Sequence, residues 1–393
     1  MDASGPRAAD RADVLVVGGG IGGLSAAYAL ATSGYAVRLY EQASRFGEVG
    51  AGLQLAPNAT RILAEWGLLD QVIDIGVLPR RLVLRDAVTG DELTSLELGA
   101  GFRERYGGPY VVAHRSDLHR ILLDACRDAG VALENGRHVE RVSPDGRVHC
   151  ADGGVHTSDA VIGADGLTST LRSAVVADEP VASGFVAYRG AVPIADIPTE
   201  VAHDEVVAWI GPGCHLVQYP LRRGEVFNQV AVFRSPAFAR GEDDWGGPDE
   251  LDTAFTHCAP AVQEALGALW RDRYWPMYDR APTPNWINGR MALTGDAAHP
   301  MLQYLAQGAC QAIEDGHTLA ARAVKHASGG GTDWDAALRA FAEARVPHTA
   351  RVQTNARTWG EIWHVDGVGR LLRNELLTTR AIDDYRYLDW LYA

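Results

Sequence analysis

Residues 14–41 read VLVVGGGIGGLSAAYALATSGYAVRLYE, and this stretch decides the fold. Val14–Val17 is a short β-branched run that predicts a buried strand. Residues 24–31 have the composition of a good helix former, and Val37 and Leu39 then alternate with polar neighbours, as in a second strand. The stretch therefore predicts a β-α-β unit, which is typical of an α/β fold.

Glycines fill the turn between the first strand and the helix. Gly18, Gly20 and Gly23 have the spacing Gly-x-Gly-x-x-Gly, and Glu41 ends the second strand. Glycines let the chain turn tightly and let its backbone approach a pyrophosphate, while the helix N-terminus faces the phosphate charge. The Glu41 carboxylate can accept hydrogen bonds from an adenosine ribose. Together these residues predict a dinucleotide site; a glycine-rich turn of another α/β fold is the alternative.

The composition narrows the class of protein. The chain has 393 residues, enough for two domains, and a formal net charge of −14. This charge argues against a surface that holds nucleic acid or anionic lipid, so the expected partner is a small molecule. The five cysteines form no Cys-x-x-Cys pair. We therefore expect neither a disulfide framework nor a metal site, and the cytoplasm as the compartment.

The most apolar stretch, residues 14–31, does not predict a membrane span or a secretory signal. Five glycines interrupt it, and no small-residue cleavage site follows it. We therefore expect no transmembrane segment, and we expect residues 1–11 to form a loose polar tail.

Later segments extend the first sheet. Ser116 is the expected N-cap of a helix that ends at Gly130. Residues 160–162 and 291–294 have the pattern of buried strands, and residues 308–324 have helical apolar spacing. The first domain is therefore interrupted and resumed along the chain.

A second sheet is predicted between these segments. Residues 185–233 contain several runs of alternating polarity, separated by Pro/Gly turns, which is typical of antiparallel strands. Residues 248–269 and the residues from about 334 onward have mainly helical patterns.

Two short acidic motifs follow predicted strands of the first sheet. Asp165 opens the run DGLTSTLR, directly after residues 160–162, and this run ends at Arg172. Asp296 belongs to the run GDAAHP, directly after the strand at 291–294. Taken alone, each aspartate would be a turn residue or a helix N-cap.

The glycine loop with Glu41 and these two runs resemble the three fingerprints of the group A flavoprotein aromatic hydroxylases, such as para-hydroxybenzoate and salicylate hydroxylases. The resemblance covers nearly the whole chain. It implies a bound FAD, with Glu41 on the ribose, Asp296 on the ribityl chain, and Asp165 in a segment that contacts FAD and helps position NAD(P)H. Arg115, in the run HRSDL, resembles a family arginine that also contacts FAD. Gly308 begins a helix whose N-terminal amides would face the flavin.

The resemblance and the pattern of elements predict an α/β fold with three parts. A Rossmann-type FAD-binding domain, like that of para-hydroxybenzoate hydroxylase, takes residues 11–75, 100–178 and 286–330. An inserted antiparallel-sheet substrate domain takes residues 76–99 and 179–285. Residues 331–393 form a helical C-terminal region.

Two further segments indicate the substrate. CHLVQYP at 214–220 and PMLQYLAQG at 300–308 resemble the 3-hydroxybenzoate 6-hydroxylases within this family, beside the salicylate hydroxylases. On a strand His215 and Tyr219 point to one face, and Gln303 would come from the loop after an FAD-domain strand. The resemblance implies that His215 accepts a hydrogen bond from the substrate phenol, Gln303 orients it and Tyr219 binds the ring. Without the resemblance, His215 and Tyr219 would be partly buried sheet residues.

Tyr106 and Pro300 are further predicted substrate contacts, with aromatic packing as the alternative for Tyr106. No arginine of the substrate segments stands out as a bidentate partner for a substrate carboxylate. We expect hydroxyls and backbone amides to bind it.

These residues predict an FAD-dependent monooxygenase that uses NADH and O2 to hydroxylate a phenolic benzoate, with 3-hydroxybenzoate converted to gentisate by attack para to the phenol. No second Gly-x-Gly-x-x-Gly unit is present, so NAD(P)H visits the bound FAD, and NADPH is the alternative to NADH. The rivals are a salicylate 1-hydroxylase, a flavin epoxidase or tailoring hydroxylase with a wide apolar cavity, and a non-catalytic flavin-binding redox sensor. A homodimer is the assembly we expect.

Overall fold

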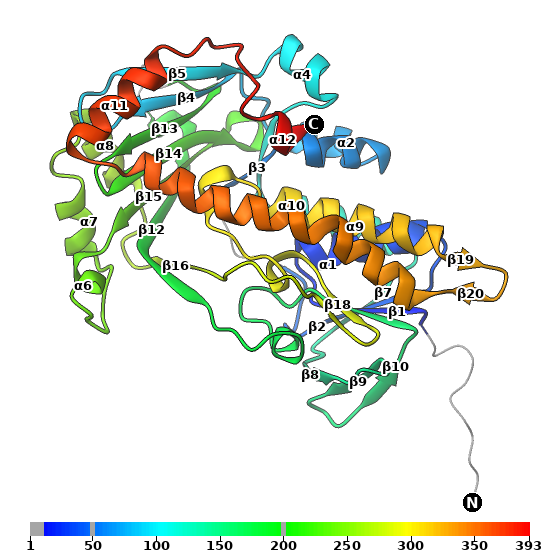
Figure 1. Ribbon diagram of the computed structural model, residues 1–393. Coiled ribbons are helices and arrows are strands. Elements are labelled where there is room, and N and C mark those ends of the chain that lie inside the picture. Colours follow the sequence, from blue (N-terminus) through cyan, green and yellow to red (C-terminus); the bar gives the residue numbers. More distant parts are fainter. Residues whose placement is uncertain (1–11, 48–51, 198–201) are drawn as a thin grey trace, which may run out of the picture.

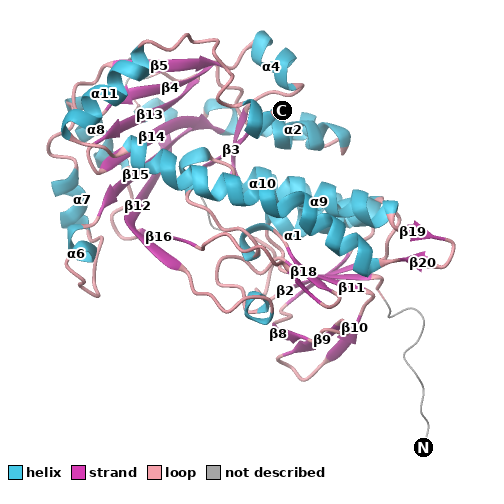
Figure 2. Ribbon diagram, viewed as in Figure 1, coloured by secondary structure: helices cyan, strands magenta, loops and turns pink. Residues whose placement is uncertain are grey.

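The computed structural model describes residues 12–47, 52–197 and 202–393 (Figure 1). The tail predicted over residues 1–11 lies outside these ranges. Two large sheets stand at opposite sides of the molecule, and the long helices α9 (Gly308–Lys325) and α10 (Trp334–Trp363) run through its middle (Figure 2).

The first sheet has six strands in the order β17-β18-β11-β1-β2-β7. All neighbouring pairs are parallel except β17 with β18. The predicted β-α-β unit is confirmed as β1 (Val14–Val17), α1 (Ile21–Thr32) and β2 (Val37–Glu41). The other strands are β7 (Ala132–Asn135), β11 (Ala160–Gly163), β17 (Ile287–Asn288) and β18 (Met291–Leu293).

Helices cover this sheet, and small residues let them approach one another. Helix α9 packs against α1, and α5 (Arg115–Asp128) packs against α1 as well. Gly316 allows α9 to lie close to α1, since a Cβ atom at this position would lie 2.7 Å from the carbonyl carbon of Ser25. The helix predicted at 308–324 is confirmed as α9, and it packs against the helix of the predicted β-α-β unit.

The second sheet has seven strands in the order β16-β12-β15-β14-β13-β4-β5. Its pairs are antiparallel, as predicted, except that β13 and β4 run parallel. No hairpin joins those two strands, so no tight turn dictates their relative direction. The strands are β4 (Arg81–Asp86), β5 (Glu92–Glu97), β12 (Val181–Pro193), β13 (Glu205–Gly211), β14 (Cys214–Leu221), β15 (Val226–Arg234) and β16 (Trp275–Asp279).

Shorter elements complete the chain. The small sheets are made of β3 (Gly52–Leu55) with β6 (Val111–His114), β8 (Val139–Val142) with β9 (Arg147–Cys150) and β10 (Val155–Thr157), and β19 (Ala327–Ser328) with β20 (Gly331–Thr332). The remaining helices are α2 (Pro57–Glu65), α3 (Leu69–Ile75), α4 (Ala100–Tyr106), α6 (Pro236–Ala239), α7 (Pro248–Ala254), α8 (Pro260–Ala265), α11 (Gly367–Thr378) and α12 (Asp389–Tyr392).

Two sequence predictions about helices were wrong in detail. The N-cap of α5 is His114 rather than Ser116, because the His114 side chain accepts a hydrogen bond from the Ser116 amide. The helix predicted over residues 248–269 is divided into α7 and α8, because Pro260 starts a new helix and cannot continue the preceding one. Gly130 does follow the end of α5 in a left-handed conformation, with φ +78°.

Strands β4 and β5 join the second sheet although they precede β12 by many residues. We keep the predicted division into an FAD-binding domain, a substrate domain and a C-terminal region as a proposal, which this arrangement supports. Among the described residues, no helix is long and apolar enough to cross a membrane.

Candidate functional site

A cavity of about 1510 Å³ is lined by both large sheets, by the start of α9 and by the C-terminal helices. Pockets for one small ligand usually measure about 300–1,000 Å³. The cavity therefore has room for an extended cofactor together with a small substrate.

The glycine loop forms one end of the cavity. Gly18 has φ +109°, and a Cβ atom there would lie 2.3 Å from the carbonyl oxygen of Ala164. A Cβ atom at Gly23 would lie 1.9 Å from the carbonyl oxygen of Gly18. The first position thus needs glycine for its conformation, and the third needs glycine so that α1 can begin directly against the loop.

Glu41 lies on the cavity wall beside this loop. Its Oε2 accepts a hydrogen bond of 2.7 Å from the Gly19 amide, and its Oε1 accepts one of 2.7 Å from the Ala43 amide. The carboxylate is therefore held at the end of β2, where the fingerprint requires an acceptor for a ribose.

Two helix N-termini face the cavity without a side-chain cap. Gly20 is the N-cap of α1, and Gln307 is the N-cap of α9, and neither provides a side-chain hydrogen bond to the helix amides. Both residues line the cavity, as does Gly308. Uncapped N-termini offer amide donors and positive dipole ends, which fit the pyrophosphate and the electron-rich flavin of FAD. The described residues at this end thus fit an FAD molecule.

The second and third fingerprints meet the same cavity. Asp165, Asp296 and Arg115 all line it. Arg172 does not line it. Its buried guanidinium makes two hydrogen bonds to Asp178, of 2.8 and 2.7 Å, and two to the carbonyls of Ala297 and Ala298, of 2.9 and 2.6 Å. Arg172 therefore ties the second fingerprint to the third instead of facing a ligand.

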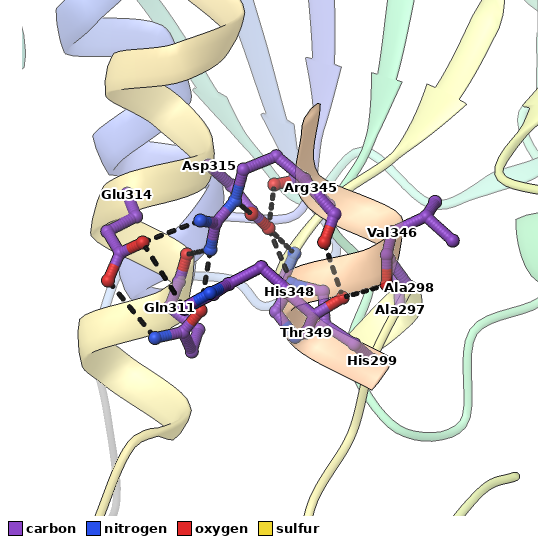
Figure 3. Close-up of polar contacts among 12 residues, drawn as sticks. Ala297, Ala298, His299, Gln311, Glu314, Asp315, Arg345, Val346, His348 and Thr349 are labelled. Carbon is purple, nitrogen blue, oxygen red and sulfur yellow. Dashed lines mark hydrogen bonds and ion pairs between the residues drawn. The ribbon is translucent and has the colours of Figure 1, made fainter. Parts of the chain in front are cut away.

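A buried acidic network, absent from the sequence predictions, fixes the Asp296 turn (Figure 3). One oxygen of Asp315 accepts from the Gly295 amide at 2.9 Å and lies 2.6 Å from His299 Nε2, and the other accepts from Arg345 Nε at 2.7 Å. Burial alone would raise the pKa of Asp315, but the charges of His299 and Arg345 outweigh it and hold the pKa well below its usual range. The ion pair between α9 and α10 thus holds the turn that presents Asp296.

The substrate-sheet side of the cavity is built on one face of β14. His215, Val217 and Tyr219 all line the cavity, whereas Cys214 and Leu216 pack into a separate core on the other face. Gln303 reaches the same cavity from the segment before α9. The alternation of side chains along β14 thus places His215 and Tyr219 on the cavity face, and Gln303 lines the same cavity from another segment.

His215 is a neutral imidazole. Its ring is buried, and Nδ1 lies 2.8 Å from Nε2 of His364, the C-cap residue of α10. Burial lowers the pKa of His215 well below its ordinary value, and the neighbouring His364 lowers it further. Nε2 has no hydrogen-bond partner within the described residues. If Nδ1 carries the proton shared with His364, Nε2 is an acceptor for a ligand hydroxyl.

Tyr219 is a neutral phenol for a related reason. Burial raises the pKa of its hydroxyl, and the charge of Arg189 lowers it only in part. Tyr219 therefore offers a hydrogen-bond donor to whatever occupies the cavity.

Three predicted contacts do not line the cavity: Tyr106, Pro300 and Gly23. Tyr106 packs among aromatic rings, and its hydroxyl donates to Asp389 at 2.8 Å, so the packing alternative was the better one. The Pro300 carbonyl accepts from Gln353 at 2.9 Å inside the protein. Gly23 acts through the close approach of α1 to the loop.

Arg189 of β12 is a cavity residue that the sequence reasoning missed. The signal was a charged residue in an otherwise apolar strand run, VAYRGAV at 186–192. That pattern is equally typical of a strand with one solvated position, so the sequence alone did not single it out.

One group of possible metal ligands lies behind β14, among the described residues. Ligand atoms of Cys214, His257 and Cys258 lie within 4.8 Å of one another, and the two thiols are 3.6 Å apart. The group offers three donors, one fewer than a closed structural zinc site has, so we assign no ion to it.

Known proteins resemble this chain along almost its whole length. The family described as FAD binding domain matches residues 11–356. A 3-hydroxybenzoate 6-hydroxylase of Polaromonas naphthalenivorans (strain CJ2) is 38% identical over 390 residues, covering 97% of this chain and 95% of the relative. A 3-amino-4-hydroxybenzoate 2-monooxygenase of Streptomyces cremeus is 38% identical over 384 residues, covering 97% and 94%.

A solved structure has the same fold. The Klebsiella pneumoniae protein HpxO, complexed with FAD and uric acid, superposes with a TM-score of 0.81 at 29% identity, covering 96% of this chain and 94% of the other.

Proposed function

Because the chain belongs to the FAD binding domain family of flavoprotein hydroxylases, we propose that it hydroxylates 3-hydroxybenzoate para to the phenol, giving 2,5-dihydroxybenzoate (gentisate). The protein is an FAD-dependent aromatic monooxygenase that acts on a small aromatic substrate with O2.

One observation carries it: His215, Tyr219 and Gln303 line the same cavity. Burial lowers the pKa of His215 and raises that of Tyr219, which favours the neutral form of each. A phenol becomes more nucleophilic at its ortho and para carbons when an acceptor withdraws its proton. His215 Nε2 is the acceptor we assign to that task. Hydroxybenzoate-hydroxylating relatives at 38% identity support a phenolic benzoate as the ring.

The residues around the cofactor have distinct tasks in this proposal. Gly18, Gly20, Glu41 and Asp296 would hold the dinucleotide, and Gly308 would present helix amides to the flavin ring. Bound FAD supplies the reaction with O2 and the transfer of one oxygen atom to the ring. The chain positions the ring, excludes water from it and accepts the phenol hydrogen bond.

NADH is the reductant we propose, by the same likeness to hydroxybenzoate hydroxylases. The six-stranded sheet carries one glycine fingerprint, at β1, so the nicotinamide would approach FAD in the shared cavity.

A second candidate substrate is 3-amino-4-hydroxybenzoate. Relatives named for that activity are also 38% identical to this chain. In both candidates a benzoate carries a hydroxyl group, so the shared chemistry is an anionic phenolic ring.

An assay across ring acids separates the candidates. The holoenzyme would be given NADH, O2 and, in turn, 3-hydroxybenzoate, salicylate, 3-amino-4-hydroxybenzoate and 4-hydroxybenzoate, with products identified by mass spectrometry and NMR. We expect substrate-stimulated NADH oxidation with gentisate formed from 3-hydroxybenzoate. Catechol with CO2 from salicylate, as the preferred reaction, would instead make the protein a salicylate 1-hydroxylase.

We also propose that the protein is located in the cytoplasm and forms a homodimer. The five cysteines are free and buried, which supports a reducing compartment such as the cytoplasm. Apolar side chains exposed along α11 support the homodimer.

A further inference from the structure

Arg189 is a partly buried cation with no anionic partner among the described residues. It lines the cavity from β12, and its Nε is inaccessible to solvent and has no hydrogen-bond partner. Within the described residues, no carboxylate forms an ion pair with its guanidinium. The group instead lies over the ring of Trp275, 5.4 Å from the ring centroid.

A guanidinium shielded from water raises the free energy of the folded protein unless a ligand supplies an anion to pair with it. Burial lowers the pKa of Arg189, and the nearby Arg115 lowers it further, while Tyr219 opposes the shift. An arginine still stays protonated at neutral pH, so it cannot escape the cost by losing its proton. Buried charges in folded proteins are paired or hydrogen-bonded, which points to an anion in the cavity.

The sheet register places Arg189 opposite the residues that handle the ring. Arg189 pairs with Val230 on β15, and Val230 pairs with Val217 on β14, between His215 and Tyr219. All these side chains line the cavity. Two strand spacings separate the backbones of β12 and β14, about 10 Å. An aromatic ring with a hydroxyl on one side and an acidic group on the other fits between the side chains that extend from them.

Other arginines line the cavity but differ from Arg189. Arg273 and Arg386 are exposed, and Arg386 pairs with Asp384. Arg137 pairs with Glu134 and Asp152. Arg380 donates to the carbonyls of Ser95 and Asp384, and Arg115 has an interaction within the chain. Among the cavity arginines of the described chain, Arg189 is thus the one whose Nε is shielded from solvent and has no acceptor.

We propose that Arg189 forms an anion subsite that binds the carboxylate of the aromatic substrate. The guanidinium has a planar fork of donors that matches a carboxylate, and it lies over the Trp275 ring at the cavity wall. Val230, Met301 and Leu302 line the same cavity and place apolar surface there. The subsite rests on the proposed function and deepens it, because it selects anionic rings over neutral ones.

The test compares two ligands that differ in charge but hardly in shape. 3-Hydroxybenzoate and 3-hydroxybenzamide would be titrated into the FAD-loaded enzyme, with binding followed by the change in flavin absorbance. The wild type should bind the acid more tightly. Arg189→Gln should weaken binding of the acid about 10- to 100-fold and change binding of the amide less than about 3-fold, since hydrogen bonds to charged groups are the stronger ones.

Two further variants complete the design. Arg189→Lys keeps the charge but loses the fork, so it should recover part of the affinity for the acid and remain informative if Arg189→Gln does not fold. Arg273→Gln removes an exposed cavity arginine and should leave the preference for the acid unchanged. FAD content and melting temperature would be measured for each variant.

Several outcomes would overturn the subsite. They are a wild type that binds acid and amide equally, an Arg189→Gln variant that loses both ligands alike, and one that loses FAD. Failure of the proposed function gives a different result: the wild type would prefer the acid and Arg189→Gln would abolish that preference, yet no gentisate would form from 3-hydroxybenzoate.

Discussion

At the residue scale, the charge state of His215 decides what it can do. An imidazole enclosed by Tyr304, Trp363 and His364 pays heavily for a positive charge, so it works as a neutral acceptor rather than as a store for a proton. A neutral ring suits the acceptor role that the family resemblance implies for His215.

A pH prediction follows for His215. Because its pKa lies well below 6.5, protonation of this ring begins only at pH values well below that, and kcat/KM for the aromatic acid should show no acid limb near pH 6.5 from it. His215→Ala should lower product formed per NADH consumed and reduce kcat for hydroxylation about 100-fold, with FAD still bound. Coupled turnover at the normal rate in this variant would remove His215 from the proposed role.

Asp315 gives a second prediction at this scale. Asp315→Asn leaves Arg345 with Glu314 as its remaining acidic partner, and we expect a loss of about 3 kcal/mol in the free energy of unfolding. The Gly295–Asp296 turn should also loosen, so FAD should bind more weakly. Urea denaturation and FAD titration measure the two effects, and Asp335→Asn at the exposed start of α10 is the control.

The acid dependence of stability provides a separate check. The folded pKa of Asp315 lies below its unfolded value of about 3.9, so its contribution is present above that pH and disappears as the pH falls toward the folded pKa. The variant should therefore lose less stability than the wild type between about pH 5 and pH 3. Parallel acid-denaturation curves would show that Asp315 is not an ionised partner of Arg345.

At the scale of elements, the loop from β1 to α1 shows why its glycines have different roles. Gly18 needs a positive φ, whereas Gly23 needs space, since its Cβ position lies against the loop backbone. Both requirements follow from a strand that turns directly into a helix.

Gly23→Ala tests this unit. The added methyl group would have to displace backbone, so we expect α1 to shift away from the loop, with FAD affinity reduced at least about 10-fold and the melting temperature lowered. Gly101→Ala in α4, where the Cβ position meets open space, should keep FAD bound and leave stability unchanged or slightly raised. Equal behaviour of the two variants would contradict the packing role of Gly23.

At the scale of the whole molecule, the C-terminal region completes the cavity and carries an apolar surface. Asp86 on β4 binds Arg370 of α11 through two hydrogen bonds of 2.8 and 2.7 Å, which fastens this helix to the second sheet. On the outer side of α11, Val368 is 72% exposed and Leu371 63% exposed. Such a row of apolar residues suits a symmetric contact with a second copy of the chain.

The assembly prediction uses these two positions. We expect the wild type to have the mass of a dimer in size-exclusion chromatography with light scattering, and Val368→Glu with Leu371→Glu to convert it to a monomer. A wild type that is monomeric at micromolar concentration would show that the chain forms no such dimer. A variant that stays dimeric would show that the contact lies elsewhere.

The fold was largely predictable because its signals are local. The glycine spacing at Gly18 to Gly23, the apolar run of β1 and the alternation along β14 each express one requirement of a turn, a buried strand or a one-sided sheet. The details that failed are those in which neighbouring groups compete, such as the cap at His114 and the break before Pro260.

The sequence by itself determined an α/β chain with an FAD fingerprint, and through its family resemblance it predicted His215, Tyr219 and Gln303 as partners at a substrate ring. Only the tertiary structure decided that His364, 149 residues away, lies against His215, and that Asp315 and Arg345 hold the cofactor turn. It also showed that Arg189 lines the cavity and that its Nε has no acceptor among the described residues. Burial and pairing depend on everything packed around a side chain, and that environment comes together only when distant segments fold against one another.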